Sequence, residues 1–203
     1  FVSGDEKLQS IAGDVATRMY DSNPADADDL SALVGNELNN QIATLGENMS
    51  LGRFAVFEAQ QPGVVGVYVH SNGKIGVMVE VGASNAATLA KPELLELAKN
   101  LAMQVAATGS VALDASCLDP ALIERERVVY RQKTLDEGKP ESIVDKIVEG
   151  RIQKYYQEVC LMEQGYIRDD KVKIKDLVQQ ECKNLGDTVT VRRFVRLPLG
   201  ESC

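Results

Sequence analysis

Leu45-Gly46-Glu47-Asn48-Met49-Ser50-Leu51 and Leu185-Gly186-Asp187-Thr188-Val189-Thr190-Val191 are two diverged copies of one stretch of this sequence. One residue later, both copies continue with Arg-Phe, as Arg53-Phe54 and Arg193-Phe194. Each copy also follows a helical pattern, so helix, Leu-Gly turn and strand form a repeated unit. Two copies are too few to build a solenoid, and the repeat therefore predicts a duplicated pair of subdomains.

The composition is typical of a soluble globular protein. The 203 residues are 44% hydrophobic and 26% charged, which suits one large domain or two small ones. A formal net charge of −8 argues against nucleic acid as a direct partner, because binding phosphates needs clustered Lys and Arg. The basic run of Arg192, Arg193 and Arg196 is interpreted as a local patch on a strand.

No apolar run approaches the roughly 20 residues that cross a bilayer, so no membrane association is expected. The first residues also lack the order of a signal peptide. Because the chain begins at Phe1 without a Met, we expect a processed product or a fragment.

The residues that usually carry chemistry are scarce. His70 is the only histidine, and no Gly-x-Ser-x-Gly motif or phosphate-binding glycine loop is present, so we expect a protein that is not an enzyme. His70 itself is either a plain surface residue or a partner contact. The scattered cysteines predict reduced thiols, no metal site and no cofactor. These cysteines are Cys117, Cys160, Cys182 and Cys203.

Hydrophobic periodicity predicts two helices at the start of the chain. Apolar residues three and four apart indicate a helix that ends near Tyr20, and Asn23-Pro24 then breaks the pattern. A second helix is predicted around residues 30–42. From Met49 to Val81 the period changes to two, and turns at Pro62-Gly63 and at residues 71–73 divide this segment into three antiparallel strands.

The second half of the sequence predicts more helices. Pro92 opens a helix with an apolar stripe, and Asp119-Pro120 is a good N-cap for an antiparallel helical hairpin that ends near Leu161. A final short helix starts at about Val172 and leads into the strand of the second Leu-Gly unit. The residues expected on the inward side of the hairpin are Leu122, Val129, Leu135, Ile143, Ile147, Val148, Tyr155 and Val159.

The predicted fold class is α+β, with two related sheet-and-helix subdomains and an inserted antiparallel helical hairpin. The first subdomain, residues 1–90, carries the three-stranded antiparallel sheet. The second comprises residues 91–118 and 162–203. The hairpin, residues 119–161, exposes much surface and is a natural place for another protein or a second copy to pack.

Several of these motifs together resemble the elongation factor Ts family, the guanine-nucleotide exchange factors of elongation factor Tu. The resemblance covers essentially the whole chain, in the order of the family. It rests on Leu45-Gly46-Glu47-Asn48, His70-Ser71-Asn72-Gly73-Lys74-Ile75-Gly76-Val77, Ala102-Met103-Gln104-Val105-Ala106-Ala107, Gly138-Lys139-Pro140-Glu141, Ile147-Val148-Glu149-Gly150-Arg151, Arg192-Arg193-Phe194-Val195-Arg196 and Leu199-Gly200-Glu201.

The resemblance implies a mechanism and a set of contacts with elongation factor Tu during translation elongation. In the family, the Phe of a Thr-Asp-Phe-Val segment inserts between two helices of the GTPase, and the phosphate-binding loop and the magnesium ion are displaced so that GDP leaves. The implied contact residues of this chain are Phe1, Val2, Leu45, Gly46, His70, Gly73 and Ile167. The resemblance also implies that the hairpin is a coiled-coil module that can serve dimerisation.

Two further expectations follow from the resemblance. The closing stretch resembles cyanobacterial and chloroplast members most, which favours the chloroplast stroma over the bacterial cytoplasm or the mitochondrial matrix. The Thr and Asp of the family segment do not precede Phe1, so the alternative hypothesis is an exchange-inactive core reused as a ribosome-associated or assembly subunit.

Overall fold

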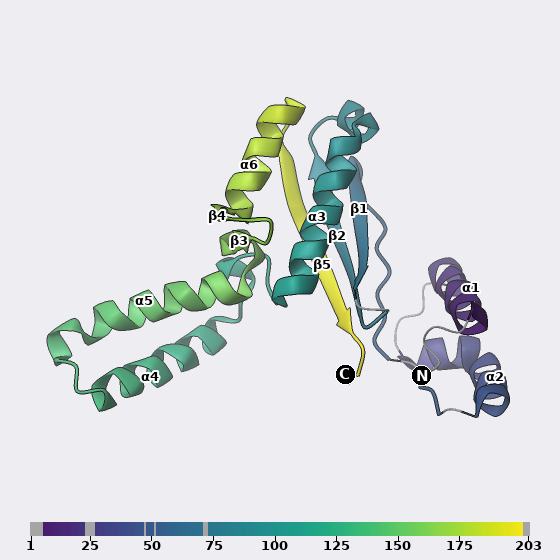
Figure 1. The fold of residues 1–203 in the computed structure, drawn as a ribbon, viewed down its shortest axis with the longest axis horizontal. Coiled ribbons are helices and arrows are strands. Elements are labelled where there is room, and N and C mark those ends of the chain that lie inside the picture. Colours follow the sequence, from purple (N-terminus) through teal and green to yellow (C-terminus); the bar gives the residue numbers. More distant parts are fainter. Residues whose placement is uncertain (1–5, 23–26, 47, 51, 71–72, 201–203) are drawn as a thin grey trace.

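The computed structural model describes residues 6–22, 27–46, 48–50, 52–70 and 73–200 (Figure 1). Three short 3-10 helices, η1 (Ala86–Ala90), η2 (Ala115–Cys117) and η3 (Leu161–Glu163), connect the larger elements. The helices are α1 (Glu6–Ser22), α2 (Ala27–Leu45), α3 (Pro92–Thr108), α4 (Pro120–Asp136), α5 (Glu141–Val159) and α6 (Ile174–Leu185). The strands are β1 (Gly63–His70), β2 (Ile75–Ala83), β3 (Gly165–Tyr166), β4 (Asp169–Lys173) and β5 (Val189–Pro198).

The main sheet has three antiparallel strands in the order β1-β2-β5, and β3 with β4 forms a small second sheet. This arrangement confirms the predicted α+β class with a three-stranded antiparallel sheet. Its third strand comes from the second Leu-Gly unit, because residues 48–50 and 52–60 have no regular secondary structure. The expectation of a strand there was wrong, while the two strands that flank the turn at residues 71–73 are confirmed.

Helix α3 covers one face of the sheet, and its apolar stripe forms the core with β2. Leu94, Leu97, Leu101 and Val105 are all buried, as their spacing predicts. The helix approaches β1 so closely that a Cβ added at Gly66 would lie 2.3 Å from the carbonyl carbon of Ala98. Glycine is therefore required at position 66 for this packing.

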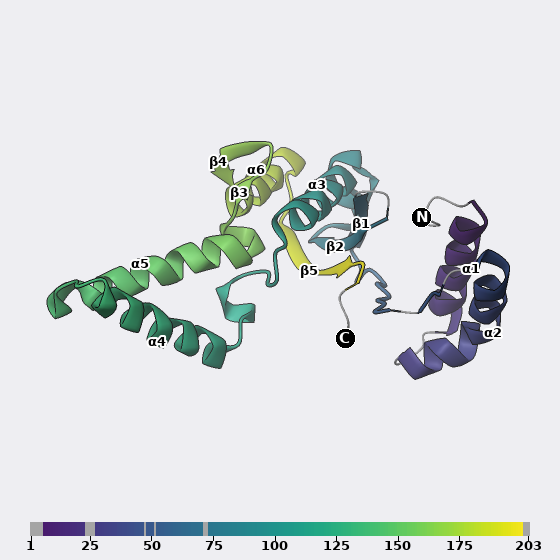
Figure 2. The same cartoon turned by 60° about the horizontal axis from the view of Figure 1, so that its bottom comes forward.

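The α4–α5 hairpin projects away from the sheet (Figures 1 and 2). As predicted, Asp119 caps α4: its Oδ1 accepts a hydrogen bond from the Ala121 amide at 2.9 Å. The predicted inward side was only partly right. Val129, Leu135 and Ile143 are exposed, whereas the buried seam consists of Ile123, Val144, Val148 and Ile152 with Thr134.

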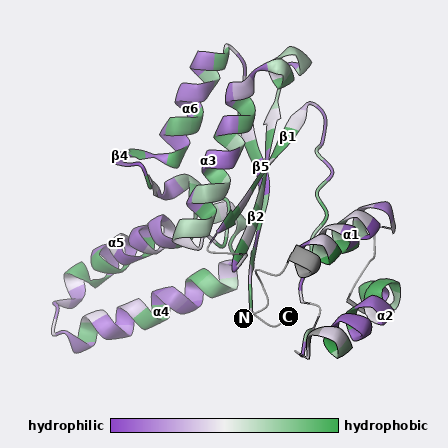
Figure 3. Cartoon of the chain, turned by 45° about the vertical axis from the view of Figure 1, so that its right-hand side comes forward, coloured by the Kyte–Doolittle hydropathy of each residue, from purple (hydrophilic) through white to green (hydrophobic). Residues whose placement is uncertain are grey.

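The reason for this difference lies in the composition of the hairpin. Figure 3 shows α4 and α5 as mostly hydrophilic, with isolated hydrophobic positions. Such helices bury only a narrow seam, so apolar residues beside the seam stay exposed. An error of one residue in placing the inward face of the helix therefore exchanges buried and exposed positions. Ion pairs span the outside of the hairpin, among them Arg127–Glu149 at 2.6 Å and Arg151–Glu137 at 2.6 Å.

Helices α1 and α2 pack against each other and lie apart from the sheet in both views (Figures 1 and 2). Leu30 and Val34 of α2 are each 2% exposed, and Arg18 Nη2 of α1 lies 2.7 Å from Glu37 Oε1 of α2. Both predicted N-terminal helices are therefore present. Residues 52–62, which belong to no helix or strand, connect this pair to β1.

The segment after α5 differs from the prediction. Val172, expected in the last helix, lies in β4, and α6 begins only at Ile174. Strands of two and five residues carry too few periodic positions to be recognised in a sequence. None of the helices within the described ranges is long and apolar enough to span a membrane.

Candidate partner-binding site

Leu45 and Gly46 form the C-terminal end of α2. The amide of Gly46 donates a hydrogen bond to the carbonyl of Ile42 at 2.9 Å, and Gly46 has a φ of +69°. Gly186 ends α6 in the same left-handed conformation, with a φ of +63°. The two Leu-Gly units are therefore equivalent helix caps, as the repeat predicts, although only the second leads into a strand.

His70 and Gly73 lie at the end of the β1–β2 hairpin. His70 is exposed, and its Nδ1 is 2.9 Å from the hydroxyl of Tyr68. Gly73 is also exposed, with a φ of +86°. The amide of Leu199 donates to the carbonyl of Lys74 at 2.7 Å, so the end of β5 is tied to this hairpin. His70 and Gly73 are therefore both accessible to a partner, at the end of a hairpin that is hydrogen-bonded to the end of β5.

Ile167 lies in the turn between β3 and β4, and its side chain is 42% exposed. The backbone amide of Ile167 donates a hydrogen bond to Oε1 of Gln104 at 2.8 Å. Gln104 is fully buried in α3. An exposed apolar side chain on a turn whose backbone is hydrogen-bonded to a buried residue is a suitable contact point for another protein.

The candidate contacts are distributed over three parts of the molecule: α2, the β1–β2 hairpin and the β3–β4 turn (Figure 1). Phe1 and Val2 lie outside the described residues, and Leu45 is described by its backbone alone. The structure thus places Gly46, His70, Gly73 and Ile167 at the surface. An extended contact surface of this kind suits a protein partner better than a small ligand.

A buried carboxylate holds the connection between α2 and the sheet. The register of β2 and β5 shifts so that Glu80 lies opposite Arg193 and Val81 opposite Val191, and Arg192 is an extra residue in β5. Both arginines reach Glu80: Arg193 Nε lies 2.6 Å from Oε2, and Arg192 Nη1 lies 3.1 Å from Oε1. Two consecutive residues therefore bind one carboxylate.

The same arginines hold residues 57–62 against the sheet. Arg193 donates to the carbonyl of Glu58 at 2.9 Å and stacks 4.3 Å from the centre of the Phe57 ring, while Arg192 donates to the carbonyl of Pro62 at 2.8 Å. We call Glu80, Arg192 and Arg193 the carboxylate clamp. It fixes the place where the chain that carries Gly46 joins the sheet.

Electrostatics keep the clamp charged. Burial on its own raises the pKa of Glu80, but hydrogen bonds from Arg193, the Gln60 amide and Arg192 outweigh it, so the pKa lies below its ordinary value of 4.5. Glu80 is 0% exposed, which makes this pairing necessary.

The interpretation of the arginines as a plain local patch missed this role. A single Glu in the apolar run from Ile75 to Val81 was the available signal.

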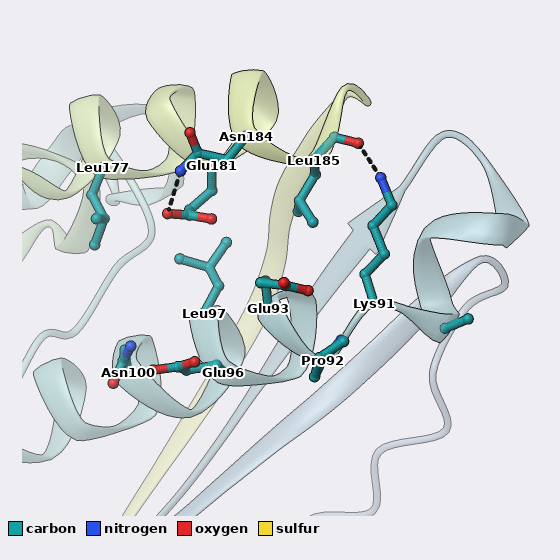
Figure 4. A pocket seen from close by; sticks show the side chains of 11 residues that line it. Lys91, Pro92, Glu93, Glu96, Leu97, Asn100, Leu177, Glu181, Asn184 and Leu185 are labelled. Carbon is teal, nitrogen blue, oxygen red and sulfur yellow. Dashed lines mark hydrogen bonds between the residues drawn. The ribbon is translucent and has the colours of Figure 1, made fainter.

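A groove of about 640 Å³ lies between the start of α3 and the end of α6 (Figure 4). Lys91 spans it by a hydrogen bond from Nζ to the carbonyl of Leu185. The side chains of Glu93, Glu96 and Glu181 also line it. None of the described candidate contacts lines this groove, which lies toward the opposite end of α3 from Gln104.

The described residues that could bind a metal ion or act as reactive thiols do not come together in one site. Among the described residues, no group of three or more His, Cys, Asp or Glu side chains is arranged to hold a metal ion. Cys117, Cys160 and Cys182 are free thiols, as predicted, while Cys203 lies outside the described residues. Burial raises the pKa of Cys160 to about 11, which leaves this thiol protonated and unreactive at neutral pH.

Comparison with known proteins decides the family. The sequence profile described as "Elongation factor TS" matches residues 1–201. The chain belongs to the elongation factor Ts family. The elongation factor Ts of Desulfovibrio desulfuricans is 52% identical over 98% of this chain and 70% of its own length. Those of Nitratidesulfovibrio vulgaris, strain DP4, and Lawsonia intracellularis are 50% and 44% identical over 99% of this chain, and over 68% and 72% of their own lengths.

These members of the elongation factor Ts family come from bacteria. The family resemblance predicted from the sequence motifs is thereby confirmed, and with it a role in translation elongation. The resemblance of the closing stretch to chloroplast members gains no support from these bacterial relatives.

Proposed function

We propose that this chain is a guanine-nucleotide exchange factor that promotes GDP release from elongation factor Tu. The observation that carries the proposal is the 52% identity to an elongation factor Ts over 98% of the chain. The compared region of 200 residues covers nearly the whole chain and so includes the elements described above. The compared region thus includes the parts of the chain that carry the candidate contacts.

The proposed activity needs binding energy and no covalent chemistry. A factor that binds the nucleotide-free GTPase more tightly than the GDP-bound form weakens GDP binding by the same ratio of affinities. A difference of about 4 kcal/mol between the two affinities corresponds to roughly a thousandfold weakening of GDP. The chain acts by binding, and the proposed mechanism requires no cofactor or metal ion bound to this chain itself.

The contact residues that we propose on this chain are Gly46 with Leu45, His70 with Gly73, and Ile167. Three of these places have physical support: Gly46 is exposed at the end of α2, His70 at the end of β1, and Ile167 on the β3–β4 turn. Hydrogen bonds hold the backbone at each of them. Phe1 and Val2 remain part of the proposal through their match to the family segment. Contacts at three separate places would orient the factor along the GTPase.

We also propose that residues 119–161 act as a separate module for dimerisation or for binding another protein. Val128, Val129 and Ile143 are exposed on this hairpin, with exposed fractions of 61%, 56% and 42%. Residues 1–90, and residues 91–118 with 162–203, would then form the two parts of the core. The bacterial relatives favour the bacterial cytoplasm over the chloroplast stroma as the compartment.

Titration of elongation factor Tu with this chain tests the proposal. Isothermal calorimetry on the nucleotide-free and the GDP-bound GTPase should give tight binding to the first and much weaker binding to the second. His70→Ala should weaken both binding affinities without changing the melting temperature of the chain. Equal affinity for the two forms would contradict the proposal, because such a factor shifts no equilibrium.

A further inference from the structure

Gln104 and Gln164 lie side by side beneath the β3–β4 turn. Gln104 is 0% exposed in α3, and Gln164, between η3 and β3, is 3% exposed. Gln104 Nε2 lies 3.3 Å from Gln164 Oε1. The two amides thus join parts of the chain that are far apart in sequence.

Gln104 holds the turn that carries Ile167. Its Oε1 accepts a hydrogen bond from the Ile167 amide at 2.8 Å, and its Nε2 donates to the carbonyl of Gly165 at 3.0 Å. Because one partner is a backbone donor and the other a backbone acceptor, the amide has a single orientation that satisfies both. One side chain therefore determines the backbone position on both sides of Tyr166.

Gln164 extends the network to the root of the helical hairpin. Its Oε1 accepts hydrogen bonds from the hydroxyls of Thr108 at 2.9 Å and Ser110 at 3.0 Å, just before and after the end of α3. Its Nε2 donates to the carbonyl of Glu158 in the last turn of α5 at 2.8 Å. Gln164 thereby fixes the side chain of Gln104 against two other elements.

Stability alone does not require an amide at position 104. A satisfied buried amide contributes little more than an apolar side chain of the same shape, and an unsatisfied one costs free energy. The neighbouring residues Leu101, Ala102, Val105 and Ala106 of α3 pack in the apolar core. What the amide adds is a defined geometry of the turn above it.

We propose that Gln104 is a positioning residue for partner binding, which holds the Ile167 turn in the conformation that elongation factor Tu contacts. The inference rests on the proposed function, because Ile167 is a proposed contact. It adds a role for a residue that cannot itself touch the partner, since Gln104 has no exposed surface.

The test is a double-mutant cycle with Gln104→Met and Ile167→Ala in the full chain. Methionine keeps the length of the side chain and removes its hydrogen bonds, and water can reach Gly165 and Ile167 because both are exposed. Gln104→Met and Ile167→Ala should each weaken the affinity for nucleotide-free elongation factor Tu about five- to tenfold. In the Ile167→Ala background the same change should have an effect below about twofold, because the side chain that it positions is gone.

A second readout does not depend on the partner. Amide hydrogen exchange at Ile167, followed by NMR, should be about tenfold faster or more in Gln104→Met, because its acceptor is lost. Thr88→Val removes the hydrogen bond from another buried side chain, Thr88 to Oδ2 of Asp187 at 2.7 Å, and is the matched control that should leave affinity unchanged.

The outcomes separate the inference from the proposed function. If the wild-type chain binds but Gln104→Met binds equally well, or if the two changes are additive, the inference is wrong while the exchange function stands. Full affinity of Ile167→Ala would also overturn it. If the wild-type chain does not bind elongation factor Tu, the proposed function fails and the positioning role fails with it.

Discussion

Glu80 Oε2 lies 2.6 Å from Arg193 Nε across the β2–β5 ladder, which pairs a carboxylate without solvent exposure with an arginine of the repeated Arg-Phe motif. The same guanidinium donates to the carbonyl of Glu58 and stacks on Phe57. Residues 57–58 follow the first Arg-Phe pair, Arg53-Phe54. The second copy of the sequence repeat therefore anchors the chain that follows the first copy.

Removing the charge of Glu80 should destabilise the fold. Glu80→Gln leaves Arg192 and Arg193 without their counter-charge, and loss of one partner of a buried ion pair costs about 3–5 kcal/mol. We expect about 2–3 kcal/mol less free energy of unfolding, because both arginines are partly exposed. Urea denaturation of the wild type and the variant measures this difference in unfolding free energy. Glu137→Gln, which breaks an exposed pair with Arg151, should cost less than about 1 kcal/mol.

The carboxylate clamp should also make stability depend on pH in acid. The pKa of Glu80 is lower in the folded protein than its ordinary value of 4.5, so the unfolded chain binds the proton more readily. The stabilisation is therefore complete above about pH 4.5 and is lost as the pH falls through the folded pKa. The difference in unfolding free energy between wild type and Glu80→Gln should shrink below that pH. A constant difference down to pH 3 would contradict the paired carboxylate.

Gly66→Ala should separate α3 from β1. The new Cβ would lie 2.3 Å from the carbonyl carbon of Ala98, a backbone atom that cannot rotate away. Overpacking of this kind costs about 1–3 kcal/mol or more. Gly76→Ala, in the neighbouring strand β2, is the control, because no heavy atom lies within 4 Å of its Cβ position. Thermal unfolding should show a large decrease in melting temperature for the first variant alone.

The two Leu-Gly caps allow a matched test of the proposed contact at Gly46. Gly46→Asp and Gly186→Asp place the same side chain in the same left-handed conformation, and each should cost about 1 kcal/mol of stability. Only Gly46→Asp should weaken binding to elongation factor Tu, because Gly186 is not a proposed contact. Calorimetric titration gives both affinities. Equal effects of the two variants would mean that the loss comes from stability and not from a contact at Gly46.

Local sequence signals predicted the elements whose patterns are long or strongly marked. The stripe of α3, the Asp119 cap and the β1–β2 hairpin at residues 71–73 each depend on neighbouring residues, so their patterns are complete in the sequence. The fold class followed from the order of these elements. Gly46, His70 and Ile167 lie at the surface, and their role as partner contacts is a proposal.

The features that the sequence did not predict depend on contacts between distant residues. Residues 52–60 have strand-like alternation, but β5 supplies the third strand. The role of the arginines depends on a bulge that brings Arg192 and Arg193 to Glu80, and no local pattern encodes this register. Gln104 is similar: a polar residue within an apolar helix face indicates a buried partner, but its partners at Gly165 and Ile167 become evident only in the fold.

Release of a fluorescent GDP analogue from purified elongation factor Tu, followed by stopped flow, tests the central proposal most directly. We expect the release rate to rise with the concentration of this chain and to saturate, and Gly46→Asp should require a higher concentration for the same rate. Gly186→Asp should behave as the wild type at a temperature where both are folded. A release rate that does not change at any concentration of the folded chain would contradict the exchange function.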